Sequence, residues 1–195
     1  MKVYKLPKLS IQEYQQQELD TGLKHEFIDG VICALAGGTI NHGRLCGNIY
    51  TELRKQLGEI DSKCEAFNSE IKLHIEKKNA FVYPDAMVIC GNTLISEEDE
   101  HAVVNPVLVA EVLSKSTSNY DRGEKFYLYR QIPSLEEYII IEQSVQVVEV
   151  YYKKPGNDLW RITRYDESNP NVELKSLGIV VSIEDIYANI NLESA

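Results

Sequence analysis

The sequence has 195 residues, of which 44% are hydrophobic and 26% are charged, so we expect one domain with an apolar core and not a disordered chain. No apolar run approaches the roughly 20 residues of a membrane-spanning helix, and the first ten residues lack the apolar segment of a secretion signal. The net charge of −10 argues against a protein that coats nucleic acid without sequence preference.

The four cysteines are scattered and form no CxxC pair: Cys33, Cys46, Cys64 and Cys90. This spacing argues against a disulfide scaffold and a zinc ribbon, and it favours buried, reduced thiols in a cytoplasmic protein. The basic residues are less scattered, because residues 41–56 and 111–130 each hold more basic than acidic side chains. A polyanion would therefore bind at one locally favoured place.

The first part of the chain predicts a helix, a hairpin and a longer helix. Residues 10–19 favour a short surface helix, and residues 26–35 favour a hairpin in which Asp29 and Gly30 supply the positive φ of a tight turn. Residues 41–58 repeat an apolar side chain every fourth position, which predicts a helix: Leu45, Ile49, Leu53 and Leu57.

Strands dominate the middle of the chain. Residues 70–75 alternate apolar and polar side chains, as in a half-buried strand. Two denser apolar runs, residues 81–90 and 107–113, predict strands that are buried on both faces. An acidic, mobile loop is expected between these two runs.

After the strands, Asp121 is predicted to cap a helix over residues 122–131, with Glu124 completing a capping box. A strand over 137–142, a hairpin that joins 145–152 to 159–165, a strand over 179–183 and a short helix from Glu184 follow. Helices mixed with strands in this order predict an α/β or α+β fold with a mixed sheet.

Two carboxylates interrupt the two most apolar strands. Because burying an isolated carboxylate is costly, Asp85 and Glu111 should protonate, form ion pairs or bind a cation. Pro84 precedes Asp85 and removes a ladder donor, which favours a bulge that re-aims the aspartate. Two such carboxylates would make the oxygen site that Mg²⁺ and Mn²⁺ prefer; a structural ion pair is the alternative for either residue.

Each of two helices carries an ionisable residue in its first turn on the apolar face. His42 lies on the face of Leu45, and Lys125 lies on the face of Leu128. The alternatives are a core or capping histidine, and a lysine whose ammonium reaches water. Asp121 is explained by capping, and Lys115 and Arg122 are most simply solvated charges.

Together these residues indicate a metal-assisted hydrolase. Two carboxylates would hold a divalent ion, and Lys125 would place a positive charge beside it, which suits phosphodiester hydrolysis. The sequence contains no GxxxxGK loop, HExxH or GxSxG motif that would favour another chemistry.

The central sequences YPDAMVIC and NPVLVAEVLSKSTSNYDRGEKFYLYRQIPSLEEYIII resemble the Uma-two family of bacterial restriction-endonuclease-like proteins, within the PD-(D/E)XK nuclease superfamily. HEFIDGVICAL, NHGRLCGNIYTEL and LKSLGIVVSIEDIY resemble the same family. The likeness thus covers roughly residues 19–187.

This resemblance implies a restriction-endonuclease-like central mixed sheet flanked by helices, with a core over about 19–143 and accessory β-strands and a short helix over 144–190 of a single domain. It also implies a Mg²⁺-dependent (or Mn²⁺-dependent) site in which Pro84-Asp85 and Glu111 are the acidic motif and Asp85 and Glu111 the metal ligands.

The resemblance also assigns roles beyond the two acids. Leu113 stands where the superfamily usually has lysine, so the following helix would supply Lys125 instead. His42 matches the family histidine, Asp121 lies in the family block, and Glu70 is a further acidic candidate. Ser114-Lys115-Ser116 departs from the usual Ser-Pro-Ser.

The leading hypothesis is therefore a metal-dependent endonuclease acting on nucleic acid, with DNA favoured. Asp85, Glu111, Lys125 and His42 would be catalytic, and the Val112 carbonyl would be a third ligand. A non-catalytic nuclease-fold module that binds nucleic acid or a protein partner is the alternative, favoured by the net charge of −10. An intact but silent site is a third. A homodimer would match duplex symmetry; no membrane partner is expected.

Overall fold

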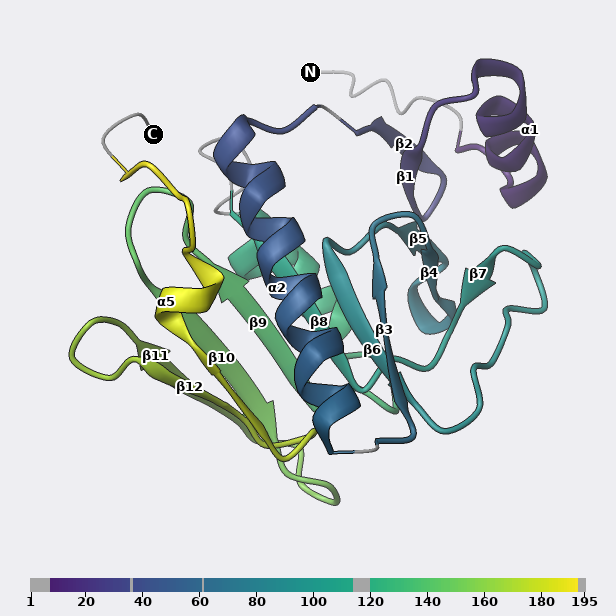
Figure 1. The fold of residues 1–195 in the computed structure, drawn as a ribbon. Coiled ribbons are helices and arrows are strands. Elements are labelled where there is room, and N and C mark those ends of the chain that lie inside the picture. The colour runs from purple at the N-terminus through teal and green to yellow at the C-terminus, as the bar shows by residue number, and fades with distance from the viewer. Residues whose placement is uncertain (1–7, 36, 61, 114–119, 193–195) are drawn as a thin grey trace, which may run out of the picture.

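A computed structural model describes residues 8–35, 37–60, 62–113 and 120–192. Its strands form a five-stranded sheet of order β2-β1-β5-β4-β7, a six-stranded sheet of order β11-β10-β9-β8-β6-β3, and the pair β12-β13 (Figure 1). Both larger sheets are mixed, because β4 pairs with β7 and β8 pairs with β9 in parallel while the other pairs are antiparallel. The predicted mixed α+β fold is confirmed.

The strands are β1 His25–Ile28, β2 Val31–Ala34, β3 Cys64–Asn68, β4 Lys72–Ile75, β5 Ala80–Val82, β6 Ala86–Cys90, β7 Ala102–Val103, β8 Leu108–Val112, β9 Glu137–Ile141, β10 Val148–Lys153, β11 Trp160–Tyr165, β12 Asn171–Leu174 and β13 Ile179–Ser182. The helices are α1 Ile11–Thr21, α2 Ile40–Glu59, α4 Phe126–Tyr129 and α5 Ile183–Ile186, with a 3-10 turn η1 Glu76–Lys78 and a π-helical turn η2 Asp121–Lys125.

The N-terminal elements follow their local signals. Ser10 and Glu13 form a capping box at the start of α1, although Tyr14 of this helix is fully buried against Phe27. The hairpin β1-β2 turns at Asp29 (φ 47°) and Gly30 (φ 88°). The predicted N-terminal helix and the predicted hairpin are both confirmed, because helix caps and tight turns depend on residues that are close in the sequence.

Helix α2 lies along one face of the six-stranded sheet (Figure 1). Its N-cap is Thr39, whose hydroxyl accepts from the His42 amide. The predicted apolar face is buried and packs in one core cluster with Val88, Ala110 and Ile139 of the sheet: Leu45, Ile49, Leu53 and Leu57. The opposite face of the sheet packs against α4 and the five-stranded sheet through Met87, Val109 and Tyr138. Strands β6 and β8 are thus buried on both faces, as predicted.

The prediction of one continuous strand over residues 81–90 is wrong. The run divides at Pro84 into β5 and β6, which belong to different sheets. A proline removes a ladder donor and so ends pairing. The two sheets therefore meet at Asp85, which lies in the linker between them.

The segment around β4 is more buried than predicted. All four residues of β4 are buried, because the strand lies inside the five-stranded sheet. The acidic loop that follows β6 is not simply a solvated loop, since Asp99 is buried and its carboxylate lies 2.7 Å from the Lys72 ammonium. Strands β3, β7 and β12 were not predicted.

The predicted helix over 122–131 is a π-helical turn followed by the short helix α4. The prediction that Asp121 caps it is wrong: Asp121 lies inside the turn, with its carboxylate buried. Arg122 is not a simple solvated charge, because its guanidinium lies 2.6 Å from Glu142 and 3.3 Å from Glu149.

The C-terminal predictions are confirmed by β9, the antiparallel pair β10-β11, β13 and α5. Strand β10 pairs with β9, so the hairpin extends the six-stranded sheet. The described helices include none with both the length and the apolar character that a bilayer span would need.

The cysteine prediction is wrong in part. Cys64 and Cys90, which face each other across β3 and β6, form a disulfide, and Cys33 is exposed. Cys46 is a partly buried thiol, as expected. Which cysteines meet depends on strand register, and spacing along the chain does not encode it.

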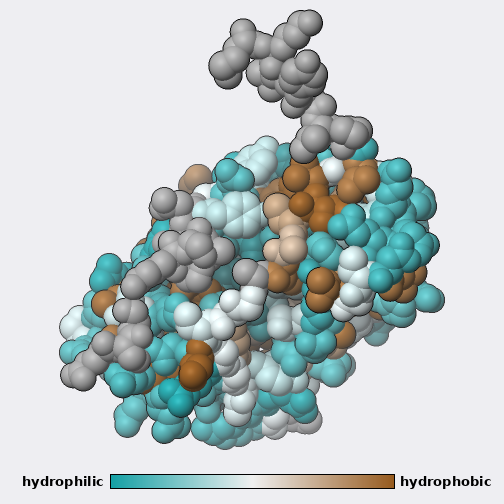
Figure 2. Space-filling view, turned by 90° about the horizontal axis from the view of Figure 1, so that it is seen from above, coloured by the Kyte–Doolittle hydropathy of each residue, from teal (hydrophilic) through white to brown (hydrophobic). Residues whose placement is uncertain are grey.

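One face of the molecule carries a group of hydrophobic side chains with hydrophilic side chains around it (Figure 2). The exposed apolar residues of the chain include Leu23, Val31 and Ile40.

Candidate metal and active site

The four residues proposed from the sequence are connected at the junction of the two large sheets. Asp85 precedes β6, and Glu111 lies within the neighbouring strand β8, where Ala86 pairs with Ala110. His42 comes from the first turn of α2, and Lys125 ends the turn η2. Segments spread over some eighty residues of chain therefore supply one cluster.

Asp85 is held by two neighbours. The Val112 amide donates a hydrogen bond of 2.8 Å to Asp85 Oδ2, and His42 Nε2 lies 3.6 Å from the same oxygen. Burial, reinforced by the negative charge of Glu111, raises the pKa of Asp85 to about 6. This carboxylate is thus destabilised as an anion, and an added cation would relieve it.

Glu111 is buried and receives two hydrogen bonds on one oxygen. The Lys125 ammonium donates to Glu111 Oε1 at 3.0 Å, and the Tyr129 hydroxyl donates to the same atom. Burial strongly raises the pKa of Tyr129, so its hydroxyl stays protonated as a donor. Glu111 Oε1 is therefore fixed in orientation.

Lys125 faces three carboxylates. Its ammonium lies 3.0 Å from Glu26 Oε1 and from Glu111 Oε1, and 3.8 Å from Asp121 Oδ1. Burial opposes its charge, but Glu111, Glu26 and Asp121 together raise the pKa of Lys125 well above its usual value. The alternative of an ammonium in water is wrong, because Lys125 is buried.

Among the residues that the structure describes, the cluster holds more negative than positive groups. Four carboxylates (Glu26, Asp85, Glu111 and Asp121) surround one lysine and the titratable His42. Burial and Glu111 raise the pKa of Glu26, although the Lys125 ammonium 3.0 Å from its Oε1 acts to lower it. Carboxylate oxygens that carry surplus negative charge fit a hard divalent cation.

His42 has a neighbour to which the sequence analysis gave no role in the site. Its Nδ1 lies 3.4 Å from Cys46 Sγ, one helical turn further along α2. Burial and the nearby Asp85 raise the pKa of the Cys46 thiol, so the thiol is protonated in the metal-free protein. The capping explanation of His42 holds only for its amide, which donates to Thr39.

Some candidates lie elsewhere. Glu70 sits in the turn before β4, where its exposed carboxylate pairs with Lys24 at 2.8 Å, so it is not part of the cluster. Lys115, with Ser114 and Ser116, lies outside the described residues. Asp121, which sequence analysis treated as a cap, does join the cluster through Lys125.

Sequence reasoning missed three residues of the site: Glu26, Cys46 and Tyr129. Glu26 could have been found from the sequence, because it is a charged residue within an otherwise apolar predicted strand. Cys46 and Tyr129 were recognised only as apolar-face neighbours of His42 and Lys125. Their contacts with Asp85 and Glu111 depend on side-chain direction across elements.

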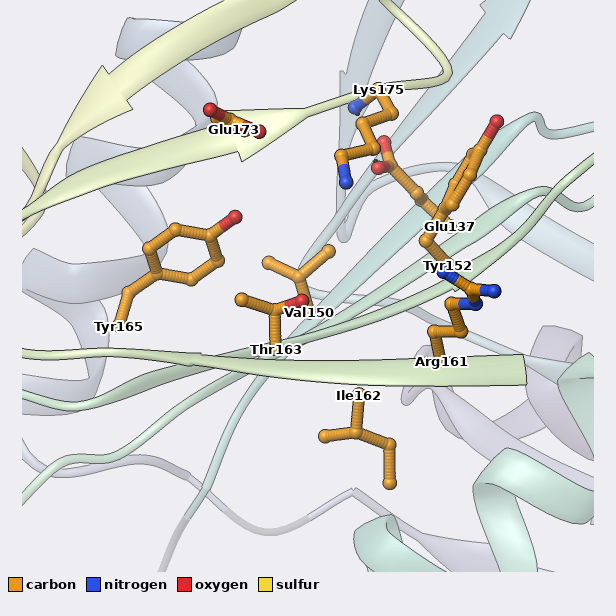
Figure 3. A pocket seen from close by; sticks show the side chains of 9 residues that line it. All are labelled: Glu137, Val150, Tyr152, Arg161, Ile162, Thr163, Tyr165, Glu173 and Lys175. Carbon is orange, nitrogen blue, oxygen red and sulfur yellow. Dashed lines mark hydrogen bonds between the residues drawn. The ribbon is translucent and has the colours of Figure 1, made fainter. Parts of the chain in front are cut away.

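A cavity of about 360 Å³ lies apart from this cluster, among residues of β9, β10, β11 and β12 (Figure 3). Its one buried acid, Glu137, accepts hydrogen bonds from the Lys175 amide at 2.7 Å and from the Ser176 hydroxyl at 2.6 Å. Because these donors satisfy the carboxylate, the cavity offers no reactive group comparable to the cluster.

Comparisons with known proteins identify the family of this chain. The family model Uma2, described as "Putative restriction endonuclease", matches residues 11–184. Two uncharacterized proteins of Synechocystis are similar: sll1609 is 38% identical over 88% of this chain and 95% of its own length, and slr1290 is 36% identical over 94% of each.

One solved structure has the same fold. The crystal structure of a "putative nuclease belonging to DUF820" from Anabaena variabilis matches with a TM-score of 0.72 at 17% identity, over 92% of this chain and 98% of that one. With the sequence matches above, this places the protein in the Uma2 family of restriction-endonuclease-like proteins.

Proposed function

We propose that this protein is a metal-dependent endonuclease that hydrolyses phosphodiester bonds of nucleic acid, with DNA the favoured substrate. The observation that carries the proposal is the surplus of carboxylates around Lys125 among the described residues, including part-buried Asp85 with its raised pKa and the buried Glu26 and Glu111. Burying carboxylates without balancing positive charge is costly, which disfavours a purely structural role.

Asp85 and Glu111 would hold Mg²⁺ or Mn²⁺. Known hydrogen bonds engage Asp85 Oδ2 and Glu111 Oε1, so we assign the other oxygen of each carboxylate as the ligand atom, with the Val112 carbonyl as a third. When bound, the ion supplies Lewis-acid stabilisation of charge on the phosphate and lowers the pKa of a coordinated water.

The other residues act around this pair. The Val112 amide and the Tyr129 hydroxyl fix the two carboxylates, which keeps their ligand atoms in place. Lys125 holds a positive charge beside Glu111, where it would stabilise negative charge that develops on the reacting phosphate or water. His42, which is part-exposed, would contact the phosphate.

We extend the proposal to a cytoplasmic protein that works as a single domain with its core over residues 19–143 and accessory β-structure over 144–190, and that pairs as a homodimer on duplex DNA. In a reducing cytoplasm Cys64 and Cys90 would be thiols.

The alternative is a module that binds nucleic acid or a protein without cleaving. The net charge of −10 and the engagement of Lys125 by three carboxylates favour it. This alternative predicts weak metal affinity, and it predicts DNA affinity that falls steeply with salt.

Calorimetric titration with Mg²⁺ and Mn²⁺, followed by a plasmid-cleavage assay, tests the proposal. We expect the wild-type protein to bind and cleave, and Asp85→Asn to lose both while keeping its fold by circular dichroism. Glu70→Gln is the matched control, because Glu70 is an exposed acid outside the cluster, and it should behave as wild type. Cleavage retained by Asp85→Asn would contradict the assignment, and wild-type protein that neither binds nor cleaves would favour the binding module.

A further inference from the structure

Three side chains of different chemistry meet beside the carboxylate pair. One ligand atom from each of His42, Cys46 and Asp85 lies within 4.8 Å of the other two. His42 Nδ1 is 3.4 Å from Cys46 Sγ, and His42 Nε2 is 3.6 Å from Asp85 Oδ2. The helical spacing of His42 and Cys46 places both on the side of α2 that faces Asp85.

These separations suit a tetrahedral metal site. Zinc–ligand bonds of about 2.0–2.3 Å at tetrahedral angles separate ligand atoms by roughly 3.3–3.8 Å. With one nitrogen of His42 as ligand, the three ligand atoms lie within 4.8 Å of one another, and small side-chain rotations would bring them into this range. All three residues are only part-buried, so an ion can enter from solvent.

Gly38 makes room for this arrangement. A β-carbon at position 38 would stand 2.8 Å from His42 Nδ1, which is closer than such atoms approach in proteins. The glycine therefore leaves the space that the imidazole occupies beside Cys46.

The ligand chemistry differs from that of the carboxylate pair. Carboxylate oxygens select Mg²⁺ and Mn²⁺, whereas thiolate and imidazole select Zn²⁺ and its analogue Co²⁺. On binding, the Cys46 sulfur would form a bond to the ion and release its proton to solvent. The cluster thus offers one sulfur, one nitrogen and one oxygen ligand, with a fourth position open.

We propose that His42, Cys46 and Asp85 form a second site, which binds a borderline-soft divalent cation of the Zn²⁺ class and shares Asp85 with the carboxylate pair. Because one carboxylate serves both sites, Zn²⁺ here would compete with Mg²⁺. The binding itself depends on these three side chains and not on cleavage.

Cobalt(II) is the probe, because a thiolate ligand to Co²⁺ gives a sulfur-to-metal charge-transfer band in the near ultraviolet. The full chain is titrated without thiol reductant. We expect the band in the wild type and its loss in Cys46→Ser, with Co²⁺ affinity at least about tenfold lower. Cys33→Ser is the matched control, since Cys33 is an exposed free cysteine outside the cluster, and it should keep the band.

Two further variants separate this inference from the nuclease proposal. Glu111→Gln should keep the band even though it removes a proposed Mg²⁺ ligand, and His42→Ala should weaken Co²⁺ binding if Cys46→Ser fails to fold. A wild type without the band, or a band that survives in Cys46→Ser or disappears in Cys33→Ser, would overturn the second site. A normal band with no cleavage by any metal would overturn only the nuclease.

Discussion

Two buried lysines stand in contrasting surroundings. Lys72 lies 2.7 Å from Glu18 Oε2 and 2.7 Å from Asp99 Oδ2, beside the ring of Tyr14. Lys125 also contacts carboxylates, but it contacts three of them. A fourth carboxylate, that of Asp85, interacts electrostatically with Glu111. Both ammonium groups are buried.

The pKa values of the neighbouring carboxyl groups differ between the two clusters. Although burial opposes the charged form, the hydrogen bond from Lys72 helps to lower the pKa of Asp99. Burial raises the pKa of Glu26 and of Asp85, and Lys125 does not fully offset it. The Lys72 cluster is a closed structural clamp that holds α1 and the acidic loop to β4, whereas in the Lys125 cluster the described carboxylates outnumber the described positive groups. Such a deficit is typical of functional sites, and it is the basis of the proposed function.

Replacing each lysine by methionine separates the two roles, and the larger effect is expected at Lys125. In the proposed nuclease, Lys125→Met would remove the charge beside the reacting phosphate, so DNA cleavage per folded molecule should fall by about 10²–10³-fold. Plasmid cleavage at saturating Mg²⁺ measures this loss. A variant that cleaves at the wild-type rate would make Lys125 a structural residue like Lys72.

Lys72→Met should instead lower stability. It leaves Glu18 and Asp99 without their cation, and breaking a buried pair costs about 3–5 kcal/mol of unfolding free energy. Urea unfolding measures the loss, and cleavage by the remaining folded protein should be unchanged. A drop in cleavage at full folding would show that this clamp also acts on the site.

A smaller effect should appear in the pH dependence of stability. The pKa of Asp85 is about 6 in the folded protein against the ordinary 3.8, so the folded state binds a proton more tightly than the unfolded chain. Stability from this group is complete below about pH 4 and is lost as pH rises through about 6. Metal-free Asp85→Asn should therefore be more stable than wild type at pH 7 by about 2–3 kcal/mol at most.

Urea unfolding between pH 4 and pH 8 tests this expectation, and the advantage of Asp85→Asn should vanish at pH 4. Asp99→Asn is the opposite case. The lowered pKa of Asp99 means that its contribution grows as pH rises, so Asp99→Asn should lose most stability at neutral pH. Equal pH profiles for the two variants would contradict the contrast between the clusters.

The sequence by itself determined what depends on near neighbours. The turn at Asp29-Gly30 and the apolar stripe of α2 follow from local chemistry, and they appear as predicted. Asp85 and Glu111 were visible as charges in apolar strands, because burial of an unpaired carboxylate is costly wherever the strand lies. The sequence and its family resemblance were also enough to propose that Asp85, Glu111, Lys125 and His42 belong to one site.

Only the tertiary structure decided which distant groups meet. Pro84 divides the predicted strand between two sheets. Where these sheets meet, Glu26 lies against Lys125, which follows it by 99 residues in the sequence. The same packing aims Cys46 at His42 and joins Cys64 to Cys90. Strand order and register fix these contacts through the burial of whole faces, and no local pattern encodes them. The charge deficit around Lys125 is for this reason a property of the fold.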